Sequence, residues 1–123
     1  MNISRAFIGL GLLCLVIGMG FGMWMGANQN FQFADAHAHW NLLGFVTSTL
    51  YGLIHRSHPQ LARSRLAWPQ FGLHAVGVLC AGPGVMLAVA AHNDTLAMIG
   101  GVLVLLAALT FLVMFVTAKA EPA

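Results

Sequence analysis

Charged residues are scarce in this sequence. Only 7% of its 123 residues are charged, whereas 59% are hydrophobic, and a soluble domain carries about 25% charged residues. This composition excludes a soluble globular protein and predicts an integral membrane protein. We therefore attribute the small net charge of +2 to the basic residues that set membrane topology, and we expect no nucleic-acid partner.

The sequence also lacks the common catalytic and covalent-attachment motifs. Its two cysteines, Cys14 and Cys80, form no Cys-x-x-Cys pair, so neither a disulfide framework nor a covalently attached c-type haem is expected. There is no Ser-His-Asp order and no phosphate-binding Gly-x-x-x-x-Gly-Lys run. The acidic residues Asp35, Asp94 and Glu121 fall near the ends of apolar stretches, which excludes a paired carboxylate site in mid-membrane.

Four apolar stretches are each long enough to cross a membrane. A hydrocarbon core of ~30 Å requires about 20 helical residues, and the stretches cover residues 6–26, 35–56, 68–91 and 95–117. Their short connections predict one all-α domain, residues 1–123, which is an integral membrane four-helix unit. Within the third stretch, Gly82-Pro83-Gly84 is expected to kink or break the helix. That feature could open space for a flat cofactor or be an ordinary kink.

The basic residues indicate the orientation of this unit. All five fall on one side of a bundle with an even number of spans: Arg5, Arg56, Arg63, Arg65 and Lys119. By the positive-inside rule, both termini and the loop between the second and third spans are cytoplasmic. We therefore expect a multi-pass protein of a bacterial-type inner (plasma) membrane.

The most informative feature is a pair of histidines at the outer end of the second span, in the run Ala-His-Ala-His-Trp-Asn-Leu-Leu-Gly-Phe at positions 36–45. An ionisable side chain within a span is costly and by default indicates a functional site. His37 and His39 leave the helix on roughly opposite sides, because each residue turns it by about 100°. The pair is therefore predicted to offer nitrogen ligands, to haem or to a metal ion, at two neighbouring sites.

The remaining membrane histidines repeat one spacing. Eighteen residues separate His37 from His55 in the second span. The same number separates His74 from His92 in the third. Eighteen residues make five turns and about 27 Å, so each helix is expected to carry two histidines on one face. His92 joins the outer pair as a candidate cofactor ligand. His55 and His74 are weaker candidates, because polar residues near the cytoplasmic surface need no functional explanation.

The run His37-Ala38-His39, followed by Gly44 and a span ending in His55-Arg56, resembles the histidine-rich tenth helix of haem-copper oxidases, and most of all that of the nitric oxide reductase branch. There the first histidine binds the high-spin haem and the second binds the low-spin haem. The catalytic subunit of that superfamily has twelve core helices in three pseudo-symmetric groups of four. Its ligand helices are the second of each group. His92 falls where the family has copper-binding histidines after its seventh helix.

The resemblance implies a homotrimer, because three four-helix units would imitate the twelve-helix subunit. His37 of one copy and His39 of the next would then clamp a haem b at each interface, and cyclic symmetry would give three equivalent sites. The sequence departs from the family in two ways. Tyr51 does not follow a histidine by four residues, which argues against an oxygen-reducing centre. The outer side has no arginine for haem propionates, which favours a rival inner site near Arg56.

We therefore expect a membrane haem b protein that acts in electron transfer or in the binding or reduction of a diatomic gas, O2 or NO, and is thus a candidate oxidoreductase. Expected partners are membrane lipid, further copies of the chain, and a quinol or cytochrome as electron donor. The alternatives are a self-contained di-haem four-helix cytochrome b, a non-haem copper or zinc protein using His37, His39, His92 and methionines, and a structural subunit without a cofactor.

Overall fold

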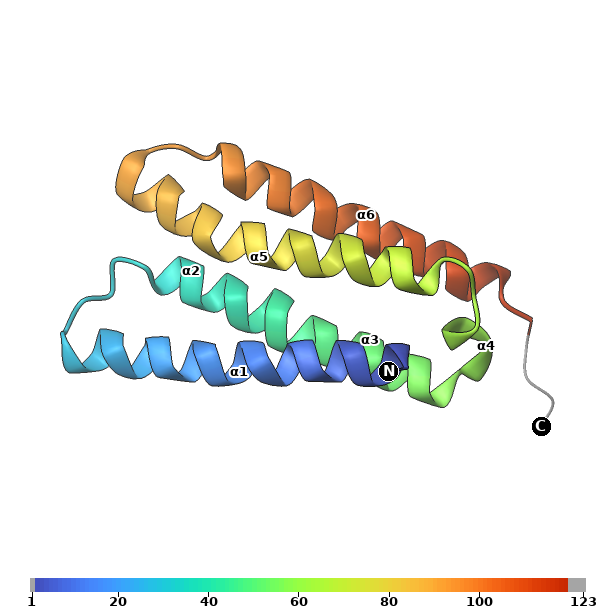
Figure 1. Ribbon diagram of the computed structural model, residues 1–123. Helices are drawn as coiled ribbons and strands as arrows, with labels where there is room; N and C mark the ends of the chain where they lie inside the picture. The colour runs from blue at the N-terminus through green and yellow to red at the C-terminus, as the bar shows by residue number, and fades with distance from the viewer. Residues whose placement is uncertain (1, 120–123) are drawn as a thin grey trace.

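The computed structural model describes residues 2–119, which form four antiparallel helical rods without any strand (Figure 1). The expectation of an all-helical chain is confirmed for these residues. The elements, in chain order, are α1 (Ile3–Ala27), α2 (Ala34–His39), the π-helical segment η1 (Trp40–Thr47), α3 (Ser48–Ser57), α4 (Pro59–Ala62), α5 (Ala67–Ala91) and α6 (Thr95–Thr117). Since α2, η1 and α3 follow one another without a gap, they make a single rod.

Three of the helices, α1, α5 and α6, are long and apolar enough to cross a membrane. They correspond to the first, third and fourth predicted spans. The second rod covers residues 34–57 and reaches about 35 Å at 1.5 Å per residue. It is more polar than the others, since it carries three histidines, two asparagine or aspartate residues and several hydroxyl side chains.

The two ends of the bundle differ in charge. The end that holds α4, the start of α1 and the end of α6 is called the inner end below, and the opposite end is called the outer end (Figure 1). The five basic residues all lie at the inner end: Arg5, Arg56, Arg63, Arg65 and Lys119. Asp35 and Asp94, the acidic residues of the described chain, lie at the outer end. The charge separation expected from the sequence is therefore present along the bundle axis.

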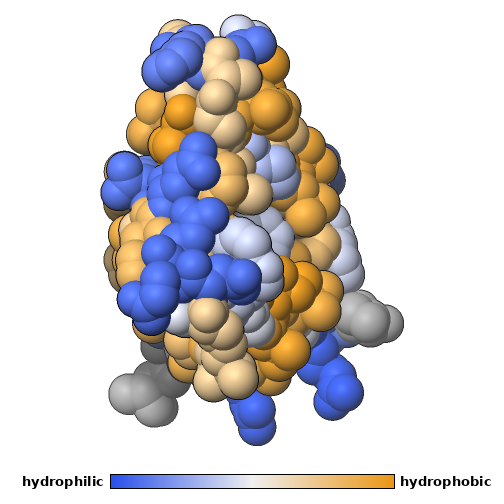
Figure 2. All heavy atoms as spheres, turned by 90° about the vertical axis from the view of Figure 1, so that its left-hand side faces the viewer, coloured by the Kyte–Doolittle hydropathy of each residue, from blue (hydrophilic) through white to orange (hydrophobic). Residues whose placement is uncertain are grey.

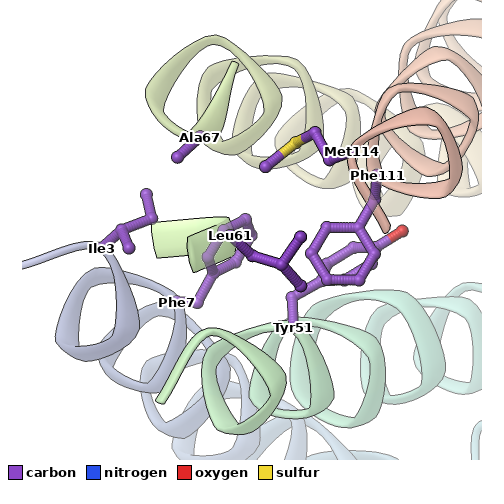
Figure 3. Close-up of a cluster of buried hydrophobic side chains, with 7 residues drawn as sticks. All are labelled: Ile3, Phe7, Tyr51, Leu61, Ala67, Phe111 and Met114. Carbon is purple, nitrogen blue, oxygen red and sulfur yellow. The ribbon is translucent and has the colours of Figure 1, made fainter. Parts of the chain in front are cut away.

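The main hydrophobic cluster lies at the inner end, where α1, α3, α4, α5 and α6 meet (Figure 3). Its buried members are Ile3, Phe7, Tyr51, Leu61, Ala67, Phe111 and Met114. Phe7 is fully buried and makes ring contacts with Tyr51 at 5.3 Å and Phe71 at 4.9 Å between centroids. Aromatic packing of this kind fixes the relative positions of the rods at the inner end.

Close backbone contact, and not large side chains, holds α5 and α6 together nearer the outer end. A methyl group added at Gly100 would lie 2.6 Å from the backbone nitrogen of Ala81. Small residues permit such close approach between membrane helices. The sequence predicts a kink or a break at Gly82-Pro83-Gly84, and the α5 helix runs through Pro83 without a break.

The π-helical segment η1 is the local feature that the sequence pattern did not predict. In a π-helix each carbonyl accepts a hydrogen bond from the amide five residues later. Two side-chain hydroxyls here contact carbonyls at the same five-residue spacing. The Thr47 hydroxyl donates to the Leu42 carbonyl at 2.9 Å, and the Ser48 hydroxyl lies 3.4 Å from the Leu43 carbonyl. A π-helical turn contains more residues than an α-helical turn. It therefore changes the angle about the helix axis between residues that precede it and residues that follow it. The five-turn argument that related His37 to His55 therefore does not apply to this rod.

Candidate functional site

His39 is exposed at the outer end of the second rod, and a backbone contact fixes its orientation. Its Nδ1 lies 2.7 Å from the Asp35 carbonyl oxygen, one helical turn earlier. Because a carbonyl oxygen only accepts, Nδ1 carries the proton and Nε2 keeps its lone pair. The side chain is exposed, so Nε2 is the free nitrogen on the surface. Proteins hold ligating histidines in this manner, with the second ring nitrogen donating to a carbonyl.

His37 is turned into its own bundle, toward α1. Its Nε2 lies 3.0 Å from the Gly18 carbonyl oxygen and 3.0 Å from the Asn41 amide nitrogen, and that amide also donates to the His37 carbonyl at 3.0 Å. A methyl group at Gly22 would approach His37 Nε2 to 2.9 Å, so the ring rests against this glycine. The two imidazoles thus leave the helix in different directions, as the two-residue spacing predicts.

His92 does not join this pair. It ends α5 in a left-handed conformation with φ of 52° and is exposed. Figure 2 looks onto the outer end and shows a band of polar residues between apolar flanks. Within residues 2–119, no group of three or more His, Cys, Asp or Glu side chains converges to hold a metal ion. His37, His39 and His92 therefore do not form one metal centre inside a single described chain.

An apolar groove of about 280 Å³ lies beside the histidine pair. Its lining comes from α1, from the start of the second rod and from α5: Ile17, Gly18, Phe21, Ala36, Trp40, Gly82, Pro83 and Met86. Trp40 closes one wall, because its ring packs on Gly82, where a methyl group would lie 3.1 Å from ring carbon Cζ3. The indole nitrogen of Trp40 donates to the Cys14 carbonyl at 2.9 Å. The groove offers apolar surface between α1 and α5, without a polar ligand of its own.

The inner histidines are both buried and lie around the same phenylalanine. His55 stacks on Phe7 with ring centroids 5.5 Å apart and planes 16° apart. The centroid of the His74 ring lies 6.0 Å from that of Phe7. The Tyr51 ring packs edge-on against His74, with centroids 5.1 Å apart. Both inner histidines therefore contact the same Phe7 ring. Since the Phe7 ring packs against both of them, a flat cofactor ligated by this pair would have to displace it.

Hydrogen bonding divides the inner pair. Nε2 of His74 lies 3.1 Å from the Leu43 carbonyl and 2.9 Å from the Ser48 hydroxyl. Both ring nitrogens of His55, Nδ1 of His74 and both amide atoms of Gln70 are buried without a hydrogen bond of good geometry in the described part of the chain, although Gln70 is a side-chain neighbour of His55. Burying such groups unpaired costs roughly 1–3 kcal/mol each. They therefore mark a place where water or a ligand is expected.

Sequence reasoning missed Ser48 and Gln70. Both are fully buried polar residues. Gln70 precedes His74 by one helical turn, and a position four residues away shares the same helix face. That spacing could have identified Gln70. Ser48 directly follows the π-helical segment and contacts His74. No spacing rule in the sequence indicates that segment.

Comparison with known proteins finds no match: no family model matches the sequence, and neither a curated protein nor a solved structure matches the chain. Function is therefore argued below from the geometry of the histidines together with the resemblance stated above.

Proposed function

We propose that this chain is a membrane haem b protein in which His39 supplies an axial ligand, and that it acts in electron transfer or in binding or reducing a diatomic gas. The observation that carries the proposal is the His39 imidazole. Its Nδ1 is held on the Asp35 carbonyl at 2.7 Å, which leaves Nε2 exposed with a lone pair. The chain thus holds a preoriented nitrogen on a surface where no other group of residues 2–119 bonds to it.

The residues at the outer end fit this group. A b-type haem needs one or two axial nitrogens and apolar surface around its ring, so the lack of a three-ligand cluster within one chain does not weigh against it. When bound, haem supplies a one-electron couple and, with an open axial position, a site for a diatomic gas. His39 would hold the iron, and a neighbouring copy would supply the surface that excludes water. A non-haem copper or zinc site fits less well, because such ions prefer three or four convergent ligands.

The inner pair is less suitable for haem. Phe7 is fully buried between His55 and His74, so a macrocycle between them would have to displace it. This packing disfavours the alternative of a self-contained di-haem cytochrome b. The nearby arginines, which could meet haem propionates, do not remove this need to displace Phe7.

Assembly follows from the direction of His39. Because its free nitrogen faces away from its own bundle, a second copy is needed to enclose a haem bound there. We propose a cyclic homotrimer, as the haem-copper oxidase resemblance implies, in a bacterial-type inner membrane with both termini cytoplasmic. The gathering of all basic residues at the inner end supports this orientation. A quinol or a cytochrome is the proposed electron donor.

The test is haem content per folded protein, measured by the pyridine haemochrome assay on protein purified in mild detergent. His39→Ala is expected to lose most of the haem. The matched control is His58→Ala, because the His58 ring at the inner end bonds locally to Ser57 at 2.8 Å. The inner double variant His55→Ala/His74→Ala is expected to keep most of its haem. Full haem content in His39→Ala, or haem-free wild-type protein, would overturn the assignment.

Native mass spectrometry of the haem-loaded protein tests the shared interface. The shared interface is supported if the protein is a trimer and releases its haem when the trimer dissociates. A haem-loaded monomer would contradict it and return the choice to a site within one chain.

A further inference from the structure

A second pocket lies at the inner end, far from the outer histidines. It has a volume of about 470 Å³ and is formed by the start of α1, the end of α3 and the short α4 helix. Its lining residues are Asn2, Ile3, Ser4, Arg5, His55, Arg56, Pro59 and Ala62. Unlike the apolar groove, this pocket has polar and charged side chains in its lining beside the apolar Ile3, Pro59 and Ala62.

Its charge is positive and is not neutralised by the described chain. Arg5 and Arg56 both line it and are exposed. Asp35 and Asp94, the acidic residues within residues 2–119, lie at the other end of the bundle. Two guanidinium groups at one pocket favour an anion, and above all one with several acceptor oxygens.

The N-terminus of α1 adds backbone donors to the same pocket. Asn2 caps the helix by accepting from the Arg5 amide at 2.8 Å. The amides of Ile3 and Ser4, in the first turn, have no carbonyl within the helix to which they can donate. The positive end of this 25-residue helix therefore points to the pocket.

An independent observation points to a ligand. His55 lines the pocket although it is only 1% exposed. The Gln70 side chain can serve one of its two ring nitrogens, and the other has no partner in the described chain. Phe7 stacks on one side of the ring and Phe111 packs edge-on at 5.4 Å. Because these neighbours hold the ring in place, it cannot turn outward to find water. A ligand oxygen at the floor of the pocket would satisfy one of its nitrogens.

We propose that this pocket binds a phosphate group, either from the headgroup of an anionic phospholipid or as free phosphate. Phosphate offers enough acceptor oxygens for Arg5, Arg56 and the first-turn amides together. The pocket also lies at the helix ends, the level at which lipid phosphates border the hydrocarbon core. The proposal does not depend on haem, since none of these residues belongs to the outer site.

The test compares two double variants that remove the same charge. Arg5→Gln/Arg56→Gln changes the pocket, while Arg65→Gln/Lys119→Gln changes two exposed basic residues at the same end that do not line it. Native mass spectrometry in neutral detergent measures binding of phosphatidylglycerol against phosphatidylcholine, and calorimetry measures inorganic phosphate. A third variant, His55→Phe, keeps the aromatic packing and removes both nitrogens.

The pocket variant is expected to bind phosphatidylglycerol at least about tenfold more weakly than wild type, because charge-assisted hydrogen bonds are lost. The charge-matched control should bind as wild type does, and His55→Phe should show a smaller loss. Binding of phosphatidylglycerol with this pattern identifies the lipid as the source. The same pattern with inorganic phosphate alone identifies free phosphate. Equal weakening in both double variants, or no binding of either probe, would overturn the proposal. Haem content, which these variants should leave unchanged, separates this result from the outer site.

Discussion

The two ends of the bundle hold their histidines in opposite ways. At the outer end, His39 is exposed and is oriented by a carbonyl of its own helix. At the inner end, His55 and His74 are buried and are oriented by aromatic rings. The comparison teaches that burial alone does not identify a cofactor ligand. An imidazole fixed by its own backbone keeps an exposed nitrogen for a large group such as haem, whereas one packed against Phe7 can reach only a small group at the edge of its ring.

The strongest test of this comparison removes the ring that fills the inner end. Phe7→Ala is expected to lower the free energy of unfolding by about 3–5 kcal/mol, because a fully buried ring leaves a cavity. The control Phe31→Ala, at the outer end, removes a ring that is 58% exposed and should change stability by less than about 0.5 kcal/mol. Denaturant titration in mixed micelles measures both. Similar losses in the two variants would contradict the view that the inner end carries the packing.

A second test concerns the region toward the outer end, where α5 and α6 touch through backbone. Gly100→Ala is expected to destabilise the protein by about 1–3 kcal/mol, since its methyl group would meet the Ala81 backbone at 2.6 Å. The adjacent Gly101 faces open space, so Gly101→Ala should be neutral or stabilise by about 0.5–1 kcal/mol through helix propensity. Thermal unfolding of the two variants checks the difference. An equal response would mean that the two helices are not in close contact.

The smallest effect concerns the polar contact of the inner end. Ser48→Ala removes a hydroxyl that lies 2.9 Å from His74 Nε2, and should cost about 1 kcal/mol of unfolding free energy. The control Thr117→Ala removes a hydroxyl that is exposed and bonds its own helix; it should change stability by less than about 0.5 kcal/mol. If Ser48→Ala is as silent as the control, the buried histidine does not depend on this contact.

Much of the architecture could be predicted from the pattern of apolar residues. Lengths of apolar sequence predicted all four rods, and three of them meet the length and hydropathy that a span requires. The second rod is different, because its π-helical segment from Trp40 to Thr47 depends on contacts with other helices. Examples are Gly44, which fits the Cys14 side chain on α1, and Leu43, whose carbonyl lies 3.1 Å from His74. Local sequence carries no sign of either contact.

The candidate sites show the same division. Spacing along one helix was enough to predict that His37 and His39 leave in different directions. It could not predict that His37 would bond to Gly18 of α1 while His39 would be left exposed. Nor could it bring Arg5 and Arg56, which are far apart in the chain, to one pocket above His55.

The sequence by itself determined a helical membrane protein with its positive charge at one end, because hydropathy, segment length and charge are properties of each residue and its near neighbours. Tertiary structure alone decided which histidine nitrogens are free. That outcome depends on which carbonyls, rings and glycines of other helices lie within a few ångströms, and a hydrogen bond or a ring contact is lost over smaller shifts than any sequence pattern can specify.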